Sequence, residues 1–305
     1  MRAITLFSIL LLGGIGAGHG QNGPMNAPQL IIRCDDIGFC HGANMAFKRV
    51  AESGMVSSVS VIVTTPWLDE AVEILKQHPE ISVGVHLALN SEWRNYKWGP
   101  VSPVDRVPSL VDVFGKFYGT RAEFFSHRPS LKEVARELRA QVDLAKRKGL
   151  KISYIDNHMG TAIATREFQA EMEKIAAENH IGISRYFGEQ EVPNVYSVAP
   201  AEKLAQALKN LNVITNGGLY LLVCHVGTDD AEMQAMVDSN ASGPKNMAQH
   251  RQAEADVLCS PSYKAALQAK GIQLVGYKDL LPKDKMRRPF LSDKYEDVVK
   301  QAIGK

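Results

Sequence analysis

The chain has 305 residues, of which 45% are hydrophobic and 22% charged, and its 35 basic and 33 acidic side chains give a formal net charge of +2. These values are ordinary for a globular protein and exclude the disordered and fibrous classes. The length suits one large domain or two modest ones. So balanced a charge gives no electrostatic reason to expect nucleic acid as a partner.

The first twenty residues have the layout of a secretory signal peptide. Met1-Arg2 is a short, positively charged start, residues 4–15 are apolar, and small residues follow up to Gly20. This apolar stretch is well short of the ~20 residues that a membrane-spanning helix needs, which disfavours an uncleaved anchor. We therefore expect residues 1–20 to be removed and residues 21–305 to form a single catalytic domain. The mature protein is then secreted or periplasmic, without stable membrane insertion.

Short apolar runs further along the chain predict buried strands. Most are rich in β-branched residues and nearly continuous, which is typical of strands covered on both faces. In chain order they are Gln29–Cys34, Ser57–Thr64, Ile81–Leu89, Leu150–Asp156, Ile181–Phe187, Leu219–Val226 and Gly271–Tyr277. Helical patterns alternate with these runs, at Asn44–Ser53, Leu68–Gln77, Leu131–Lys148, Thr165–Asn179, Ala201–Leu211 and Ser262–Lys270.

This alternation of strands and helices predicts a parallel α/β fold. About seven such units favour a TIM-barrel-like (β/α) arrangement over a flat doubly wound sheet. Two segments do not fit the alternation, the Trp-, Pro- and Gly-containing Asn90–Ser130 and the polar Asp229–Arg251. Long loops in compact domains tend to be lids or binding loops. From Lys283 on, we expect a charged tail with a short amphipathic helix.

The four cysteines are Cys34, Cys40, Cys224 and Cys259, and they have no spacing typical of a zinc site. Cys34 and Cys224 lie in apolar, strand-like runs, where a free cysteine usually acts as a small buried hydrophobe. An exported protein can form disulfides, but one of this length does not need them. We favour buried thiols and leave a bridge open.

Acidic and imidazole side chains recur at the ends of the predicted strands. Asp35-Asp36 ends the first strand, His86 lies in the third, Asp156-Asn157-His158 ends the fourth and His225 lies in the sixth. Ligands of parallel α/β folds bind at the carboxyl ends of the strands. We therefore expect these side chains to share one rim.

Each of these residues has a plainer interpretation when taken alone. A single histidine in a strand is more often a satisfied core residue, and Asp36 or Asp156 can be a helix N-cap. Two adjacent, half-buried carboxylates are harder to explain, since they repel unless a cation is present. One carboxylate and two imidazoles commonly hold a hydrolytic divalent ion. A second carboxylate can then act as general base, and a further histidine can protonate a departing amine.

Five short motifs together resemble, in order, those of the YdjC-like carbohydrate deacetylases, a family that includes chitooligosaccharide deacetylases. They are Cys34-Asp35-Asp36-Ile37-Gly38, similar to the family's A-D-D-F-G; Gly84-Val85-His86-Leu87, similar to G-x-H-hydrophobic; Ile155-Asp156-Asn157-His158, similar to hydrophobic-D-S-H; Cys224-His225-Val226-Gly227, similar to C-H-P-G; and Arg251 with Glu254 and Leu258, similar to R-x-x-E-x-x-x-L. Each motif alone is weak, but the ordered set extends from Leu30 to about Tyr277 and is specific.

The resemblance implies a distorted (β/α) barrel with an Asp-His-His metal site. Carried over by position, Asp36, His86 and His158 are the expected ligands of one divalent ion. The residues leave zinc and magnesium open, although two histidines lean toward a transition metal. The resemblance also assigns Asp35 as the general base and His225 as the general acid.

Substrate contacts are expected from Trp93, Trp98 and Arg251. Aromatic rings stack on the apolar faces of sugars, although these tryptophans can equally serve to pin a long loop. Arg251 steadies the catalytic carboxylates in one interpretation and is a solvent-exposed helix residue in the other. Met159-Gly160-Thr161 departs from the family pattern, which puts the usual substrate contacts after His158 in doubt. Arg33 is a separate departure, in place of a smaller polar residue.

The sequence therefore predicts a metal-dependent hydrolase that removes the N-acetyl group of an amino sugar, oligosaccharide or glycan and releases acetate. The predicted export favours an external polymer or glycan as substrate. One alternative is another metal-dependent hydrolase on the same scaffold, an esterase or a phosphodiesterase. A second is a non-catalytic glycan-binding protein, which the complete set of catalytic positions disfavours. The sequence leaves a homo-oligomer open.

Overall fold

The computed structural model describes residues 27–215, 217–241 and 243–281. In these ranges the strands form one sheet in which every ladder is parallel. The strands are β1 (Gln29–Ile37), β2 (Ser58–Val61), β3 (Ser82–Leu87), β4 (Ile152–Asn157), β5 (Gly182–Ile183), β6 (Gln190–Glu191), β7 (Leu219–Cys224) and β8 (Gln273–Leu274). Their order is β5-β4-β3-β2-β1-β7-β6, and β8 pairs with the first residues of β1.

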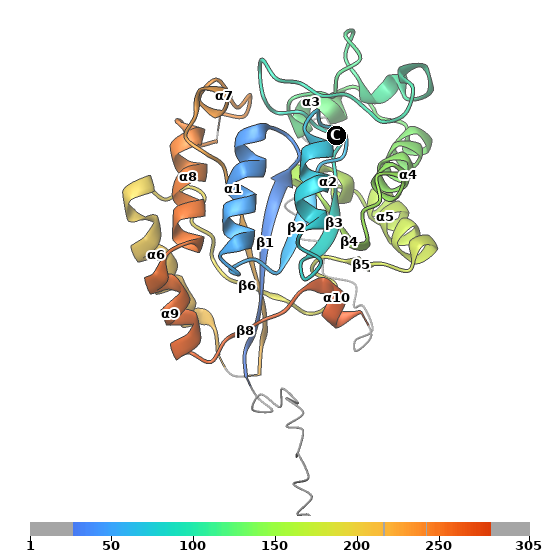
Figure 1. Ribbon diagram of the computed structural model, residues 1–305. Coiled ribbons are helices and arrows are strands. Elements are labelled where there is room, and N and C mark those ends of the chain that lie inside the picture. Colours follow the sequence, from blue (N-terminus) through green and yellow to red (C-terminus); the bar gives the residue numbers. More distant parts are fainter. Residues whose placement is uncertain (1–26, 216, 242, 282–305) are drawn as a thin grey trace, which may run out of the picture.

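The sheet curls into part of a barrel, and helices cover its outer side (Figure 1). The helices are α1 (His41–Glu52), α2 (Leu68–Lys76), α3 (Arg121–Ser126), α4 (Leu131–Arg147), α5 (Arg166–Asn179), α6 (Lys203–Asn210), α7 (Ala231–Gln234), α8 (Met247–Leu258), α9 (Pro261–Ala269) and α10 (Tyr277–Leu280). Among the described residues no ladder joins β5 to β6, so the barrel is open between them. The expected distorted (β/α) barrel with about seven parallel strands is confirmed.

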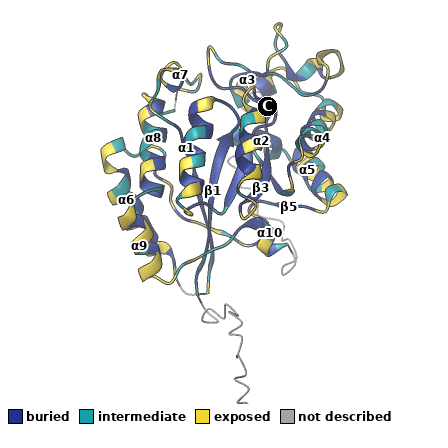
Figure 2. Ribbon diagram, viewed as in Figure 1, coloured by how far each residue is buried: buried dark blue, intermediate teal, exposed yellow. Residues whose placement is uncertain are grey.

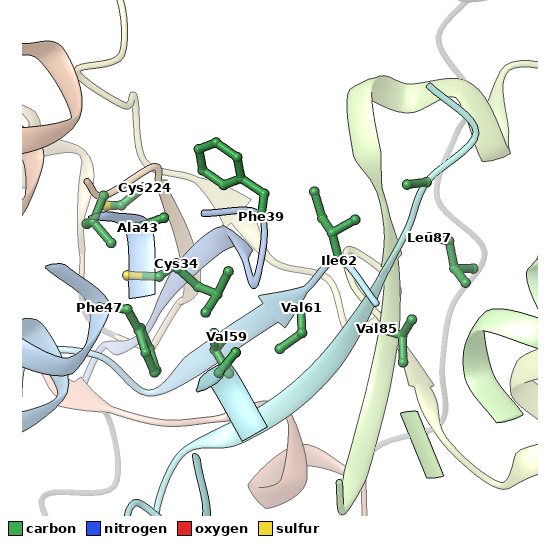
Figure 3. Close-up of a cluster of buried hydrophobic side chains, with 14 of the residues drawn as sticks. Cys34, Phe39, Ala43, Phe47, Val59, Val61, Ile62, Val85, Leu87 and Cys224 are labelled. Carbon is green, nitrogen blue, oxygen red and sulfur yellow. The ribbon is translucent and has the colours of Figure 1, made fainter. Parts of the chain in front are cut away.

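The strands follow from their apolar sequences. In β1–β3 one set of alternate side chains points outward and packs against the helices, and Figure 3 shows Cys34, Val59 and Val85 in this layer. The opposite set points into the barrel, where a smaller cluster fills the interior: Ile31, Tyr154, Phe187, Leu221, Val223, Tyr277 and Leu280. Strands β1–β5 and β7 are thus largely buried, β6 and β8 are not, and the helices keep exposed outer faces (Figure 2).

Helix α4 illustrates how the pattern fixes a boundary. Its buried positions include Val134, Leu138 and Val142, which recur at helical spacing on one face. The helix ends at a basic last turn, and Gly149 follows with φ of 84°. A positive φ favours glycine, which has no Cβ, so this residue ends the helix at low cost.

The cysteines lie where the apolar runs place them. Cys34 and Cys224 are register partners in β1 and β7, and burial raises the pKa of both thiols well above its usual value. Cys40 is also buried, and all four cysteines are free thiols. The preference for buried thiols over a bridge therefore agrees with the structure.

Two sequence expectations differ from the structure. Strands β5 and β8 have only two residues each, and the two-residue β6 was not expected, because so short a strand carries no periodicity. The segment expected as a polar loop to Arg251 is helical from Met247 onward. Arg251 and Glu254 lie on the buried face of α8 among its apolar residues, which obscured the amphipathic pattern.

The expected signal peptide (1–20) and the tail from Lys283 lie outside the described residues. Within the described ranges no helix is both long and apolar enough to cross a membrane.

Candidate active site

A bulge in β1 brings two adjacent carboxylates to the same side. From Cys34 to Ile37, β1 advances three residues while its partner β2 advances two, from Val59 to Val61. Such an extra residue is the mark of a β-bulge. Adjacent side chains of a regular strand point to opposite faces, but Asp36 has φ of 65°, and both Asp35 and Asp36 line one cleft. The predicted aspartate pair thus has a local backbone cause.

Strand pairing places His86 beside Asp156. The two are register partners in β3 and β4, and Nδ1 of His86 lies 2.6 Å from Oδ1 of Asp156. The other ring nitrogen, Nε2, faces Asp36 with a distance of 3.4 Å to Oδ1. Asp156 therefore orients the imidazole so that Nε2 is presented to the cleft.

His158 is held in the same way from the other side. It follows β4, and the next two residues, Met159 and Gly160, have φ of 54° and 74°, so the chain turns sharply. Nδ1 of His158 lies 3.2 Å from Oδ1 of Asp36, and Nε2 lies 2.8 Å from Oε2 of Glu92. Glu92 comes from the long loop after β3 and is 5% exposed.

The three expected ligands form a group that fits a divalent ion. Oδ1 of Asp36 is buried and has no hydrogen-bond partner in the described structure, although it lies between the two imidazole nitrogens. One ligand atom from each of Asp36, His86 and His158 lies within 4.8 Å of the others. A carboxylate oxygen and two imidazole nitrogens suit zinc or a similar transition ion. The residues present therefore fit the expected metal.

The charges around this group favour a cation at its centre. Burial opposes charge on the imidazole of His86, but Asp156 and Asp35 outweigh it and raise its pKa to about 9. For His158, Glu92 and Asp36 likewise outweigh burial and raise the pKa to about 10. Several buried carboxylates thus surround the two rings, and a positive charge among them is electrostatically favourable. A protonated imidazole supplies such a charge, and a divalent ion supplies it as well.

Arg251 reaches Asp36 from α8. Its Nη2 lies 2.7 Å from Oδ2 of Asp36, and the residue is 2% exposed. The guanidinium also lies over the rings of Phe39 and Trp93, at 5.0 and 5.5 Å. Burial raises the pKa of Asp36, but Arg251 and the imidazoles outweigh it and hold that pKa well below its usual value. The interpretation of Arg251 as an exposed helix residue is therefore wrong, and the residue steadies a carboxylate.

Asp35 is held by a second buried arginine, from its own strand. Nε and Nη2 of Arg33 donate to the two carboxylate oxygens of Asp35, at 2.6 and 2.7 Å. Nη2 also lies 2.8 Å from Oδ2 of Asp156. Asp35, His86 and Asp156 form a second close group of potential ligands, but the Arg33 guanidinium already supplies a positive charge between its two carboxylates.

His225 lies directly after β7, with its ring against Tyr196 at 5.2 Å between centroids. Its Nδ1 is buried and has no hydrogen-bond partner in the described part of the chain. His225 lines the same cleft as Asp35 and Asp36. The structure therefore brings the expected base, acid and ligands together.

The cleft has a volume of about 1010 Å³ and is open to solvent. Polar side chains line it, including Asn157 at the end of β4 and Arg185, Asp238 and Asn240 from loops. A space of this size is at the upper end of the range for small-molecule sites. It has room for more than one sugar ring.

The two tryptophans expected to stack on sugar are buried. Trp93 reaches the cleft wall but is only 1% exposed and stacks on Phe39 at 5.8 Å. Trp98 is 3% exposed, is not among the residues lining the cleft, and lies 6.1 Å from the ring of His158. The alternative interpretation, that these rings pin the loop, fits Trp98 better. The loop folds inward instead of presenting its aromatic faces to the cleft.

Sequence reasoning missed the partners that orient the histidines. Asp156 was noted only as a strand-end carboxylate, and Glu92 was not singled out. Glu92 lies six residues after His86, directly before Trp93, and only its burial in the fold distinguishes it from a surface glutamate. Arg33 was noted only as a departure from the family pattern.

The fold and this cleft define an α/β-barrel protein whose carboxylate–imidazole site is suited to metal-dependent hydrolysis. The sequence model of the family described as YdjC-like protein matches residues 29–269, and the chain belongs to this family. A carbohydrate deacetylase of Brevibacillus brevis is 28% identical over 263 residues, which cover 83% of this chain and 99% of the relative. A carbohydrate deacetylase of Enterococcus faecalis is 26% identical over 276 residues, with coverages of 84% and 99%.

A solved structure supports the fold. It is described as a cellobiose-phosphate cleavage protein of Enterococcus faecalis and matches with a TM-score of 0.71 at 23% sequence identity. The match covers 83% of this chain and 99% of that one. The distorted barrel is therefore shared along most of the chain.

Proposed function

We propose that this protein is a metal-dependent carbohydrate deacetylase that hydrolyses the N-acetyl group of an amino sugar or oligosaccharide, giving acetate and a free amine. The observation that carries the proposal is the unpartnered Oδ1 of Asp36 between His86 and His158, with Asp35 and His225 on the same cleft. The family and the names of its relatives support the same reaction class.

Asp36, His86 and His158 would hold the ion. Such an ion polarises a carbonyl group and lowers the pKa of water when it is bound. Asp156 and Glu92 fix the orientation of the two rings by accepting from their outer nitrogens. Arg251 holds the second oxygen of Asp36, so that its free oxygen points to the imidazoles.

Asp35 and His225 would move the protons. Asp35 takes a proton from the attacking water, and Arg33 keeps its carboxylate in place through two hydrogen bonds. His225 returns a proton to the sugar nitrogen, because an amine leaves poorly without one.

We also propose that the protein acts outside the cytoplasm, on an external polymer or glycan. The support is the signal-peptide layout of residues 1–20. Expression in a host with a secretory system, followed by amino-terminal sequencing of the exported protein, tests this. A mature start near Gln21 supports export, and an intact Met1 on a protein that stays in the cytoplasm contradicts it.

The reaction is tested by incubating the purified protein with a panel of N-acetylated sugars and oligosaccharides, with and without a chelator, and measuring released acetate. We expect chelator-sensitive acetate from at least one of them. Asp36→Asn and His158→Ala should lose metal binding, whereas Asp35→Asn should keep the metal and lose turnover. The matched control is His180→Asn, at the exposed, left-handed carboxyl end of α5.

The outcomes separate the alternatives. No acetate from any sugar, with the metal bound, contradicts the deacetylase and directs the search to ester substrates. An Asp35→Asn variant with a near-normal rate contradicts the assignment of the base. Sugar binding without product would support a glycan-binding protein.

A further inference from the structure

A buried ion pair lies behind His225, outside the cleft. Nζ of Lys203, on α6, is 3.1 Å from Oε1 of Glu254, on α8. Lys203 is 0% exposed and Glu254 is 2% exposed, and neither side chain is among those lining the active-site cleft. Lysine and glutamate are almost never buried so completely without a specific partner.

The pair connects three segments around His225. Oε2 of Glu254 accepts from the backbone N–H of His225 at 2.8 Å. Nζ of Lys203 donates to the backbone oxygens of Val195 and Tyr196, at 2.7 and 3.0 Å, as well as to Glu254. An ammonium group has three N–H donors, so all of those of Lys203 are used.

The shortness of β6 explains why His225 needs this acceptor. Backbone groups of alternate β7 residues face opposite neighbours: the oxygen of Gly218 accepts from Gln29 of β1, whereas the oxygen of Leu221 accepts from Val192, directly after β6. The backbone N–H of His225, four residues after Leu221, therefore faces the β6 side, where the described ladder ends at Glu191 and Leu221. The carboxylate of Glu254 takes the place of a strand partner there. Because Lys203 also holds the backbone of Tyr196, the ring of Tyr196 stays against the ring of His225.

We propose that Lys203 and Glu254 are positioning residues. They hold His225 and Tyr196 together at the place from which His225 protonates the leaving amine. The inference rests on the proposed role of His225. Folding alone gives little reason to retain such a pair, since replacement of a buried ion pair by apolar side chains is often neutral or stabilising. The pair is explained if it fixes the position from which His225 gives its proton.

The experiment compares an amide with an ester that needs no acid. The protein with its metal is assayed on an N-acetylated oligosaccharide and on 4-nitrophenyl acetate, whose leaving group departs without a proton. For Lys203→Met we expect kcat on the amide to fall about 10–100-fold, as for a small misplacement of a catalytic group, with KM nearly unchanged. Ester hydrolysis and metal affinity should change less than about threefold on the same argument. Lys148→Met, at an exposed pair with Asp69, is the control and should behave as wild type.

A second variant keeps the proposal testable if Lys203→Met fails to fold. Lys203→Met/Glu254→Gln removes both buried charges and keeps an amide oxygen that can accept from His225. We expect it to be folded, to recover part of the amide activity, and to leave the ester rate unchanged. Introduced into His225→Ala, Lys203→Met should cause no further loss on the amide. Equal losses on amide and ester, or additive losses in that background, overturn the proposal.

A spectroscopic measurement separates this inference from the proposed function. The ring C–H signals of 13C-labelled histidine can be assigned with His225→Ala and His158→Ala. In Lys203→Met we expect the His225 signal to shift or broaden while that of His158 stays in place. An unchanged His225 signal overturns the positioning role whatever the enzyme hydrolyses. If wild type cleaves no N-acetyl sugar but the His225 signal moves, the proposed function fails and the positioning role stands.

Discussion

Nδ1 of His86 lies 2.6 Å from Oδ1 of Asp156, and the opposite ring nitrogen lies 3.4 Å from Oδ1 of Asp36. The carboxylate behind the ring thus determines which nitrogen faces the cleft. His158 repeats the arrangement with Glu92 behind it and Nδ1 facing Asp36. The two rings present different nitrogens to one oxygen because their supporting carboxylates come from different segments, β4 and the loop after β3.

Asp156→Asn should weaken metal binding. Loss of the carboxylate behind a ligating histidine typically costs about 10–100-fold in metal affinity. Competition against a coloured chelator gives the dissociation constant directly. Asp69→Asn, on the exposed side of α2, should leave the affinity unchanged. An Asp156→Asn protein that melts like wild type and binds the metal equally well would show that β4 does not orient His86.

Glu92→Ala should have a similar effect through His158. The loss should again be about 10–100-fold in affinity, and Glu92→Gln should lose less, since its amide oxygen can still accept from the ring. The same competition assay measures both variants. Equal affinities for Glu92→Ala and wild type would restrict Glu92 to a role in holding the loop.

Arg33→Met should destabilise the fold. It leaves Asp35 and Asp156 buried beside each other without their cation, and removal of one partner from a buried pair costs about 3–5 kcal/mol. Urea unfolding followed by circular dichroism measures the change. Arg139→Met is the control, since Arg139 is 30% exposed and its pairs with Glu171 and Glu178 are worth about 1 kcal/mol or less. Equal losses for the two variants would mean that Arg33 is not needed to balance these carboxylates.

Glu137→Ala should loosen the long loop after β3. Glu137 is fully buried on α4, and its two oxygens accept from the backbone N–H groups of Val101 and Ser102, both at 2.9 Å. Each unsatisfied buried donor costs about 1–3 kcal/mol, so a total loss of about 2–6 kcal/mol is expected for the two donors. Limited proteolysis should cut the variant sooner within the loop. A digestion pattern identical to wild type would contradict this tether.

The sequence predicts most of the sheet, because buried parallel strands have continuous apolar runs. It also predicts that Asp35, Asp36, His86, His158 and His225 meet, since the carboxyl ends of parallel strands share one edge. The exact partners of these residues depend on side chains from distant segments. Glu92 and Lys203 read as ordinary surface residues in the sequence, and only their burial identifies them.

Two other features of the structure could not be predicted from the sequence, for physical reasons. Helix α8 carries Arg251 and Glu254 on its buried face, so a rule that looks for apolar spacing does not find it. Trp98 lies in a polar loop typical of sugar-binding sites, yet two side chains of α4 hold the segment after β3 against the barrel. Glu137 accepts from the backbone of Val101, and Gln141 accepts from the backbone of Ala88. The direction in which a loop folds depends on such tertiary contacts.

The residue at position 36 has to meet two independent requirements, one from the site and one from the left-handed backbone. The side chain must offer an oxygen, and the residue must tolerate φ of 65°, which aspartate, asparagine and glycine do most easily. Asparagine is therefore the substitution that isolates the charge, whereas valine or threonine would disturb the strand and the ligand together. Few substitutions at this position are therefore compatible with the fold. A descendant that loses the metal would most easily retain the fold with asparagine or glycine here.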